Sequence, residues 1–301
     1  MAGDIRHRQI QLGEIELHVA EQGEGRPVLL LHGFPELWYS WRHQMAALAD
    51  AGYRAVAPDM RGFGRSSAPT AVEAYDIVEL CSDVAGLLDD LGAEKAAVAG
   101  HDWGATVAWH FALMHPERTA CVAGLSVPIV PNPPAAPIGL MREHLGEDFY
   151  IVWFQEPGVA DQALARDVRR TLLTPAVWTA AWAADESENA RVPAFMTEQD
   201  VTLYVEEYER TGFTGGLNWY RNIDRNRERT LEYDDRKIDM PALFMAGTRD
   251  STMKWMSPEV MDGRVSDLRS ELVDGAGHWL QQERPDEVNR ALLTLLEDAG
   301  W

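Results

Sequence analysis

Short apolar runs alternate with amphipathic stretches along much of the chain, and this alternation predicts the order of strands and helices. Residues 8–12 and 15–20 alternate polar and apolar positions, which predicts two half-buried strands. The apolar run 27–31 predicts a buried strand that leads into the loop HGFP. Further strands are expected at 53–57, 95–99 and 120–127, and helices at 40–51, 77–91 and 103–115. This order predicts an α/β fold with a mostly parallel sheet covered by helices on both faces.

The pattern changes between about residues 131 and 239, where Trp-rich helical segments follow the stretch PIVPNPPAAP without a strand-like run. Strand-like runs return at 241–246 and 271–274, and an amphipathic helix is expected over 285–296. The sequence therefore predicts two domains. Residues 1–130 and 240–301 form an α/β core, and residues 131–239 form an inserted helical cap, or lid.

The chain is acidic: its 301 residues include 27 Lys and Arg against 48 Asp and Glu, a formal net charge of −21. No basic run offers a place to neutralise phosphates, so we expect neither nucleic acid nor an anionic membrane as a partner. No apolar run reaches the roughly 18 residues that would span a bilayer. The first residues resemble a strand more than a signal peptide, and the expected location is therefore the cytoplasm.

Cys81 and Cys121 are the two cysteines, and each lies in an apolar stretch typical of a reduced, buried thiol. Neither belongs to a Cys/His pattern with zinc-like spacing, so no metal is expected. No other cofactor is expected either.

The motif GHDWG over residues 100–104 stands where a buried strand meets a helix. Its outer glycines permit the sharp turn of a nucleophile elbow, with Asp102 in the place that Ser holds in many hydrolases. An Asp that merely caps the following helix is the alternative interpretation. Two later residues favour the elbow, because Asp250 and His278 each follow a predicted strand in the chain order of an α/β-hydrolase fold.

An Asp nucleophile points to a particular chemistry. A carboxylate is ionised near neutral pH and can attack a saturated carbon without a base, which produces an ester that water can cleave. His278 would activate that water and Asp250 would orient the histidine. The amides of Phe34 and Trp103 are the expected donors of an oxyanion hole.

Several motifs together resemble the soluble, cytosolic-type epoxide hydrolase family over nearly the whole chain: HGFPELWYSWRHQ, APDMRGFGRSSAP, GHDWGATVAW, WFQEPG, LNWYRN and GAGHW. The resemblance implies two cap tyrosines that bind the epoxide oxygen. The LNWYRN motif assigns one to Tyr220, and the position four residues before FQEPG assigns the other to Tyr150. The resemblance also implies a cis bond between Phe34 and Pro35.

The remaining aromatic residues suggest an apolar pocket, although core packing alone would explain any one of them. Pro35 belongs to the loop beside the nucleophile. The tryptophans expected to line or floor the pocket are Trp38, Trp153, Trp178, Trp182 and Trp219.

The sequence thus predicts an epoxide hydrolase that converts apolar epoxides and water to vicinal diols through an Asp102 alkyl ester. Two rivals stay open at this point. A haloalkane dehalogenase would use the same nucleophile, with the Trp103 ring as a halide donor, and a non-catalytic receptor could share the fold. The sequence does not fix the oligomeric state, and a homodimer is compatible with it.

Overall fold

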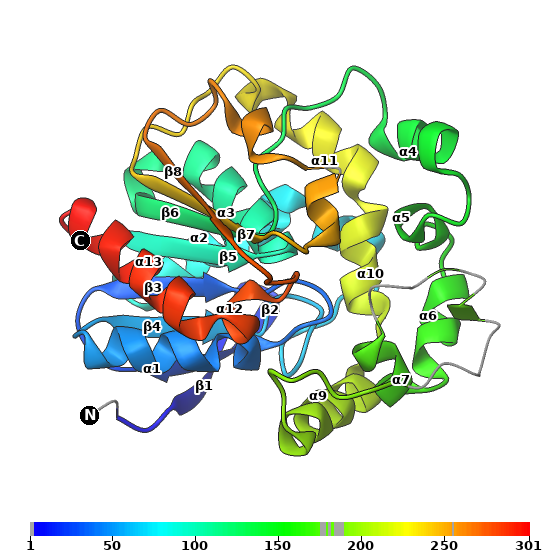
Figure 1. Ribbon diagram of the computed structural model, residues 1–301, viewed down its shortest axis with the longest axis horizontal. Helices are drawn as coiled ribbons and strands as arrows, with labels where there is room; N and C mark the ends of the chain where they lie inside the picture. The colour runs from blue at the N-terminus through cyan, green and yellow to red at the C-terminus, as the bar shows by residue number, and fades with distance from the viewer. Residues whose placement is uncertain (1–2, 175–178, 180–181, 184–189, 255) are drawn as a thin grey trace.

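The computed structural model describes residues 3–174, 179, 182–183, 190–254 and 256–301. In this part of the chain the centre is an eight-stranded sheet with the order β1-β2-β4-β3-β5-β6-β7-β8 (Figure 1). β2 pairs antiparallel with β1 and with β4. The remaining neighbours in the sheet, from β4 through β3, β5, β6 and β7 to β8, all pair in parallel. The strands are β1 (Arg6–Leu12), β2 (Ile15–Gln22), β3 (Pro27–Leu31), β4 (Arg54–Pro58), β5 (Ala96–His101), β6 (Thr119–Leu125), β7 (Ala242–Gly247) and β8 (Leu268–Val273).

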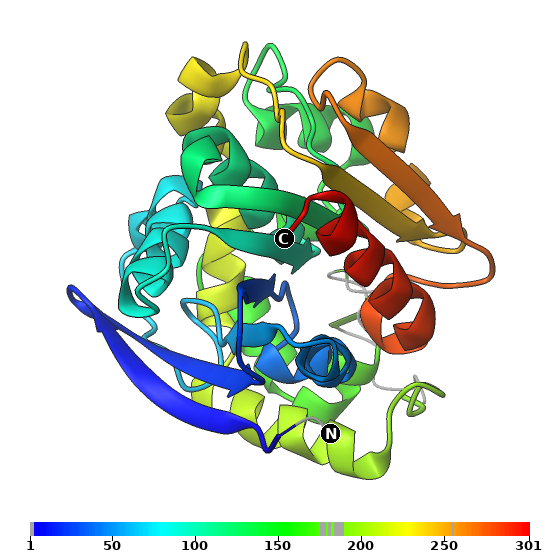
Figure 2. The same cartoon turned by 90° about the vertical axis from the view of Figure 1, so that its left-hand side faces the viewer.

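Helices cover both faces of this sheet (Figure 2). On one face α1 (Arg42–Asp50) and α13 (Pro285–Asp298) pack together and against β4 and β7. On the other face α2 (Ile77–Asp90) packs on α3 (Trp103–Met114), which contacts β5 and β6. One buried apolar cluster lies on each face. Every residue of β5 is buried, which is why its sequence is a continuous apolar run and not an alternating one.

A group of helices that we call the cap lies between β6 and β7 in the chain (Figure 1). The described cap helices are α4 (Pro137–Leu145), α5 (Tyr150–Trp153), α6 (Val159–Ala165), α7 (Val168–Leu173), α9 (Glu198–Thr211), α10 (Thr214–Arg221) and α11 (Ile223–Thr230). Local signals set their ends: Thr197 and Asp200 form a capping box at the start of α9. The expected helical insertion is therefore present, while its limits at residues 131 and 239 stay a prediction.

The core elements lie close to their expected positions, with one larger difference at β8. This strand begins at Leu268 and not at residue 271. β8 is the last strand of the sheet, and most of its side chains are partly or fully exposed, so its first residues lack the apolar pattern of a buried strand. The short helix α12 (Leu280–Glu283) also lies outside the expected elements. Among the described helices, none combines the length and the apolar character needed to cross a membrane.

Candidate active site

Asp102 occupies a sharp turn between β5 and α3. Its backbone has φ 54° and ψ −122°, a conformation that a non-glycine residue rarely adopts. The glycines on both sides permit the turn, since a Cβ on Gly100 would lie 2.0 Å from the Gly104 carbonyl oxygen. A Cβ on Gly104 would lie 2.0 Å from the Leu31 carbonyl oxygen. The Asp102 side chain makes no capping hydrogen bond to α3, which leaves its carboxylate free of the structural role considered above.

Three side chains meet beyond the carboxyl ends of β5, β7 and β8. His278 Nδ1 lies 3.0 Å from Asp250 Oδ2, and His278 Nε2 lies 3.4 Å from Asp102 Oδ2. The Thr252 amide donates to the other oxygen of Asp250 at 2.9 Å and holds this carboxylate in place. The structure thus brings Asp102, Asp250 and His278 together, with the imidazole of His278 between the two carboxylates.

The HGFP loop supplies a donor to the nucleophile. The Phe34 amide donates to Asp102 Oδ1 at 2.9 Å, and the Phe34–Pro35 peptide bond is cis. Gly33 lies so close that a Cβ there would be 2.3 Å from Asp102 Oδ1. Trp103 is the first residue of α3, directly after the nucleophile, and the part of its amide in an oxyanion hole stays a prediction.

The electrostatics of the three groups are coupled. Burial disfavours an ionised Asp102, but hydrogen bonding and charge interaction with His278 outweigh it and hold the pKa of Asp102 below its usual value. The same partner outweighs burial at Asp250 and lowers its pKa to about 2. Burial alone would lower the pKa of His278, whereas Asp102 and Asp250 raise it well above 6.5. The two carboxylates of the free site therefore favour a protonated imidazole between them.

Both predicted tyrosines come from the cap and face the elbow. Tyr150 begins α5 and Tyr220 lies in α10, and their ring centroids are 5.9 Å apart. The Tyr220 ring also meets Phe34 at 5.7 Å and Trp103 at 5.1 Å. Burial, followed by the charge of Asp102, raises the pKa of both phenols above 10. Both hydroxyls thus stay protonated and can donate at neutral pH.

Glu36 and His101 form a buried pair beside the elbow. The sequence places His101 in the elbow motif, where a supporting role is expected, whereas it gives no signal for Glu36. Glu36 accepts from the Gly33 amide at 3.0 Å, from Gln281 Nε2 at 2.8 Å and from His101 Nδ1 at 2.8 Å. His101 Nε2 lies 2.7 Å from the His278 carbonyl oxygen, which is only an acceptor. His101 Nε2 therefore donates to that carbonyl, and its other ring nitrogen is hydrogen-bonded to Glu36. Burial opposes a charged Glu36, but His101 and the Gly33 amide hold the pKa of Glu36 below its usual value.

The predicted pocket residues divide into two groups. Trp153 is buried beside Phe154, and Trp219 is buried against Trp103, so both lie next to the tyrosines. The Trp38 ring packs instead on His7, His18 and Tyr39, and its described ring contacts do not join it to Tyr150 or Tyr220. Trp182 is buried and stacks with Arg170, whereas Trp178 lies outside the described residues.

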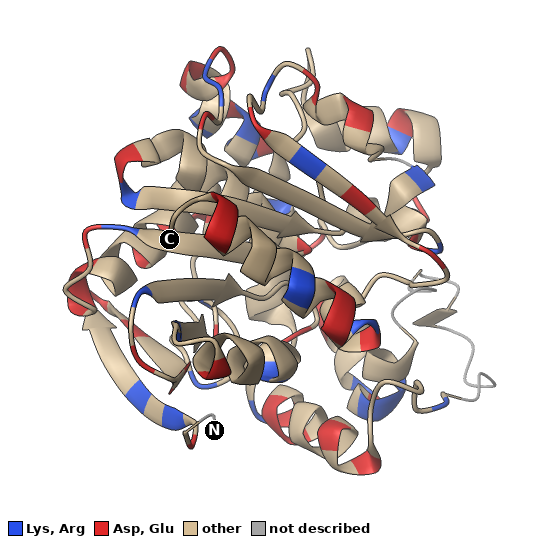
Figure 3. Cartoon of the chain, turned by 60° about the vertical axis from the view of Figure 1, so that its left-hand side comes forward, with Lys and Arg blue, Asp and Glu red and all other residues tan. Residues whose placement is uncertain are grey.

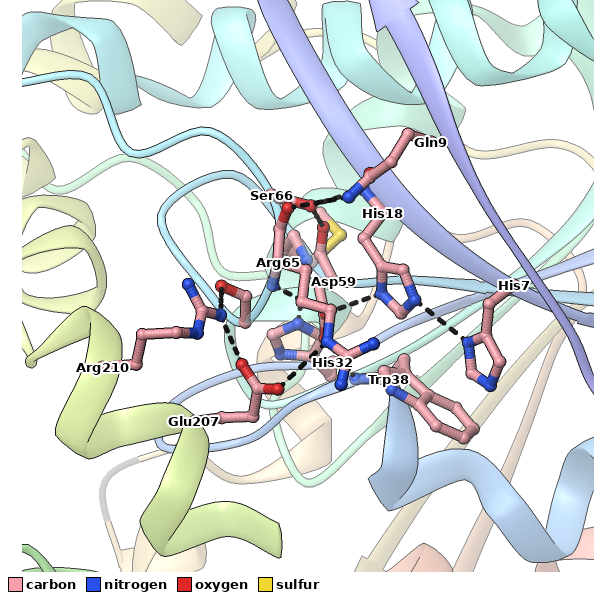
Figure 4. Close-up of polar contacts among 12 residues, drawn as sticks. His7, Gln9, His18, His32, Trp38, Asp59, Arg65, Ser66, Glu207 and Arg210 are labelled. Atoms are coloured by element: carbon pink, nitrogen blue, oxygen red, sulfur yellow. Dashed lines mark hydrogen bonds and ion pairs between the residues drawn. The ribbon is translucent and has the colours of Figure 1, made fainter.

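A second polar network lies beside the HGFP loop and extends to the cap (Figure 4). Asp59 accepts from the Trp38 amide at 3.1 Å and from the Arg65 amide at 3.1 Å, and it pairs with His18 at 2.7 Å. Arg65 in turn contacts Glu207 on α9 at 3.1 Å. This network fixes the loops beside the nucleophile and attaches a cap helix to them. The described residues contain no group of three or more His, Cys, Asp or Glu side chains arranged to hold a metal ion.

The sheet, the elbow and the carboxylate–histidine–carboxylate geometry define an α/β hydrolase, and the alpha/beta hydrolase fold family model matches residues 26–285. Epoxide hydrolase A of Mycobacterium tuberculosis is 48% identical to the chain, with 98% of each covered. Bifunctional epoxide hydrolase 2 of Sus scrofa is 38% identical over 94% of this chain and 53% of its own. The crystal structure of Epoxide Hydrolase A from Mycobacterium thermoresistibile superposes with a TM-score of 0.91 at 48% identity, covering 98% of both chains. The chain belongs to the epoxide hydrolase family of α/β hydrolases.

Proposed function

We propose that this enzyme hydrolyses epoxides to vicinal diols through a covalent ester of Asp102. The observation that carries the proposal is the position of one carboxylate, which contacts the Phe34 amide and His278. The paired rings of Tyr150 and Tyr220 come from the cap, and the Tyr220 ring packs on Phe34 and Trp103 beside this carboxylate. A carboxylate nucleophile needs a saturated electrophilic carbon, and the phenols are donors suited to a departing alkoxide.

In the first step an oxygen of Asp102 attacks a ring carbon of the epoxide and the carbon–oxygen bond of the ring breaks. Tyr150 and Tyr220 donate hydrogen bonds to the ring oxygen as it acquires negative charge. Their raised pKa values keep both hydroxyls protonated for this task. As the charge of Asp102 is lost, His278 gives up its proton and the ring oxygen gains one by way of the phenols, so the product is a hydroxyalkyl ester of Asp102 beside a neutral imidazole.

In the second step His278 accepts a proton from water, which attacks the carboxyl carbon of the ester. Ester formation prepares the base for this role: it removes the charge of Asp102, one of the two carboxylates that hold the proton on His278, and so lowers the pKa of His278. Asp250 keeps the imidazole oriented. The Phe34 amide, which donates to Asp102 in the free site, and the Trp103 amide stabilise the tetrahedral oxyanion.

The aromatic surroundings support an apolar substrate. Phe34, Phe154 and Trp103 all contact the Tyr220 ring, so the space beside the nucleophile is bordered by rings. A styrene-like or aliphatic epoxide suits such a border better than a charged one. Cys81 and Cys121 are buried free thiols, compatible with the reducing cytoplasm in which we propose that the enzyme acts.

Isotope incorporation tests the ester directly. A single turnover of styrene oxide in ¹⁸O-labelled water should place the label in the Asp102 carboxylate and leave both oxygens of the first diol unlabelled. Peptide mass spectrometry and analysis of the diol measure the two outcomes. Label that enters the first diol would show direct attack of water on the epoxide and exclude the ester. Halide release from a bromoalkane, without any turnover of the epoxide, would contradict the proposed leaving group.

The His278→Gln variant separates the two steps. It should react once with the epoxide and stop as the ester, because Asp102 needs no base to attack whereas water does. Intact-protein mass spectrometry should show one added substrate mass, and the matched Asp102→Ala variant should show none. A folded His278→Gln protein that never gains mass would refute this division of roles.

A further inference from the structure

β8 forms an open edge of the central sheet. It is the last strand in the sheet order, and it pairs with β7 through residues 242–247 on one side only. Within the described part of the chain no other strand pairs with it, and Figure 2 shows it at the margin of the molecule. An unpaired edge offers a row of backbone donors and acceptors to another strand.

The hydrogen bonds to β7 show which backbone groups of β8 point outward. The carbonyls of Asp267 and Val273 accept from amides at the two ends of β7, so odd-numbered residues face β7. Backbone groups of successive residues in a strand point alternately to the two sides. The amide and carbonyl of Leu268, Ser270 and Leu272 therefore point away from the sheet.

The side chains of β8 match a second copy of the same strand. Its sequence is LRSELV, in which Arg269 and Glu271 stand on either side of Ser270, and Leu268 and Leu272 stand one position further out. Leu272 is 57% exposed, which is high for a large apolar residue. On the opposite face of the strand Arg269 is exposed and Glu271 is partly exposed, and the two form an ion pair within the strand that can exchange for the equivalent pairs between two copies. When two copies of β8 pair antiparallel with Ser270 opposite Ser270, Arg269 of each copy lies opposite Glu271 of the other. In the same register Leu268 of each copy lies opposite Leu272 of the other.

This register also satisfies the backbone. The backbone amides and carbonyls of Leu268, Ser270 and Leu272 point outward, so these residues form the hydrogen-bonded pairs between the two strands. The Arg269–Glu271 pairs fall on the non-hydrogen-bonded positions, where opposite side chains come closest. The other sheet edge lacks this match, because β1 carries Arg6 and Arg8 without an acidic residue, so two copies of β1 would bring four arginines together with no acidic partner from either strand. Acidic residues are spread over the remaining surface (Figure 3), so the neutral, self-complementary strand is a suitable place for two acidic molecules to meet.

We propose that two copies of this chain dimerise through β8. The strands pair antiparallel about a two-fold axis at Ser270 and join the two sheets into one continuous sheet. The occupant of the edge is a second copy and not an unrelated peptide, because one strand supplies both members of each charged and apolar pair.

Charge exchange across the two-fold axis tests the register. The Arg269→Glu variant opposes Glu to Glu twice, and the Glu271→Arg variant opposes Arg to Arg twice, so each alone should weaken dimerisation about tenfold or more. An equimolar mixture of the two should form heterodimers, since the two acidic side chains of one copy then face the two basic side chains of the other. Analytical ultracentrifugation in 150 mM salt, where repulsion beyond about 8 Å is screened, measures the three dissociation constants.

A second variant addresses the backbone. Ser270→Pro removes an amide that points away from β7, so the sheet of one copy keeps its hydrogen bonds while strand addition is blocked. Circular dichroism and styrene oxide turnover should be unchanged in all these variants, because none of the altered residues contacts the active site. A monomeric wild-type protein up to 100 μM would overturn the proposal. So would single variants that dimerise as tightly as the wild type, or a mixture of them that stays monomeric.

Discussion

A carboxylate at position 102 determines what the elbow can attack and what must follow. Asp102 adopts a strained backbone, touches Gly33 and lies within reach of His278. The triad could be predicted from sequence because GHDWG, Asp250 and His278 follow strands in a fixed chain order. Glu36 could not, because its place after HGFP reads like the start of an exposed helix, and only the tertiary contacts with His101 and Gln281 reveal its burial.

Loss of one phenol should slow the first step. We expect Tyr150→Phe to reduce the rate of Asp102 alkylation about 100-fold, the effect of removing one donor to a developing oxyanion. Rapid-quench measurement of the ester gives this rate. Tyr204→Phe is the matched control: it also removes a buried cap hydroxyl, but one outside the Tyr150–Tyr220 pair, and it should react at nearly the wild-type rate. Equal rates for the two variants would contradict the role of Tyr150.

Removal of the Glu36 carboxylate should destabilise the fold. Glu36→Ala leaves buried polar groups of His101, Gln281 and Gly33 without their partner, which costs about 3 kcal/mol or more of unfolding free energy, since each unsatisfied group costs about 1–3 kcal/mol. Urea denaturation at pH 7 measures the loss, with the exposed Glu14→Ala as a control that should change stability by less than about 0.5 kcal/mol. A loss below about 1 kcal/mol for Glu36→Ala would argue against a stabilising role for this buried network.

At the scale of elements, the two tyrosines are held differently. The helix of Tyr220 is attached to the core, since Trp219 Nε1 donates to the Arg61 carbonyl at 3.0 Å. Tyr150 is attached through Arg221, which donates to the Phe154 carbonyl at 3.0 Å just after α5 and pairs with Asp161 on α6. The sequence predicts that both helices exist, but such attachments depend on side-chain geometry that no local pattern encodes.

We expect Arg221→Met to lower kcat/KM for styrene oxide about tenfold, because α5 would position Tyr150 less accurately. In a Tyr150→Phe background the same change should have little further effect, since the two residues act through one contact. Arg142→Met, which alters an exposed arginine of α4, is the control and should leave kcat/KM unchanged. Additive losses in the double variant would show that Arg221 acts independently of Tyr150.

At the scale of the whole molecule, residues as far apart in the chain as Gly33 and Gln281 meet at one site. They do so because the sheet places the carboxyl ends of β5, β7 and β8 at the same edge. The sequence predicts the alternation of strands and helices and a mostly parallel sheet. It does not predict which strands are neighbours or which stands at the edge, since these depend on contacts between distant residues. β8 begins at Leu268, before the expected residue 271, for the same reason: the strand lies at the edge of the sheet, so its first residues lack a buried apolar pattern.

The coupled charges make stability depend on pH. An Asp250 pKa of about 2 in place of 3.8 contributes about 2 kcal/mol, which is complete above about pH 4 and is lost as pH falls toward 2. The pKa of His278 is raised above 6.5, so its contribution is complete below pH 6.5 and is lost as pH rises through the raised value. Asp250→Asn should therefore lower Tm most between pH 4 and 6.5. Calorimetry from pH 3 to 10 measures this, and a constant difference across that range would contradict it.

The position of His278 between two carboxylates also determines how hydrogen ions move during catalysis. In the proposed mechanism the imidazole loses one when the ester forms, and the opened ring oxygen gains one. Water then gives one back to the imidazole as the ester is cleaved. The full cycle neither takes up nor releases a hydrogen ion, so turnover at constant pH should be insensitive to buffer concentration, and the buried triad needs no relay to the solvent.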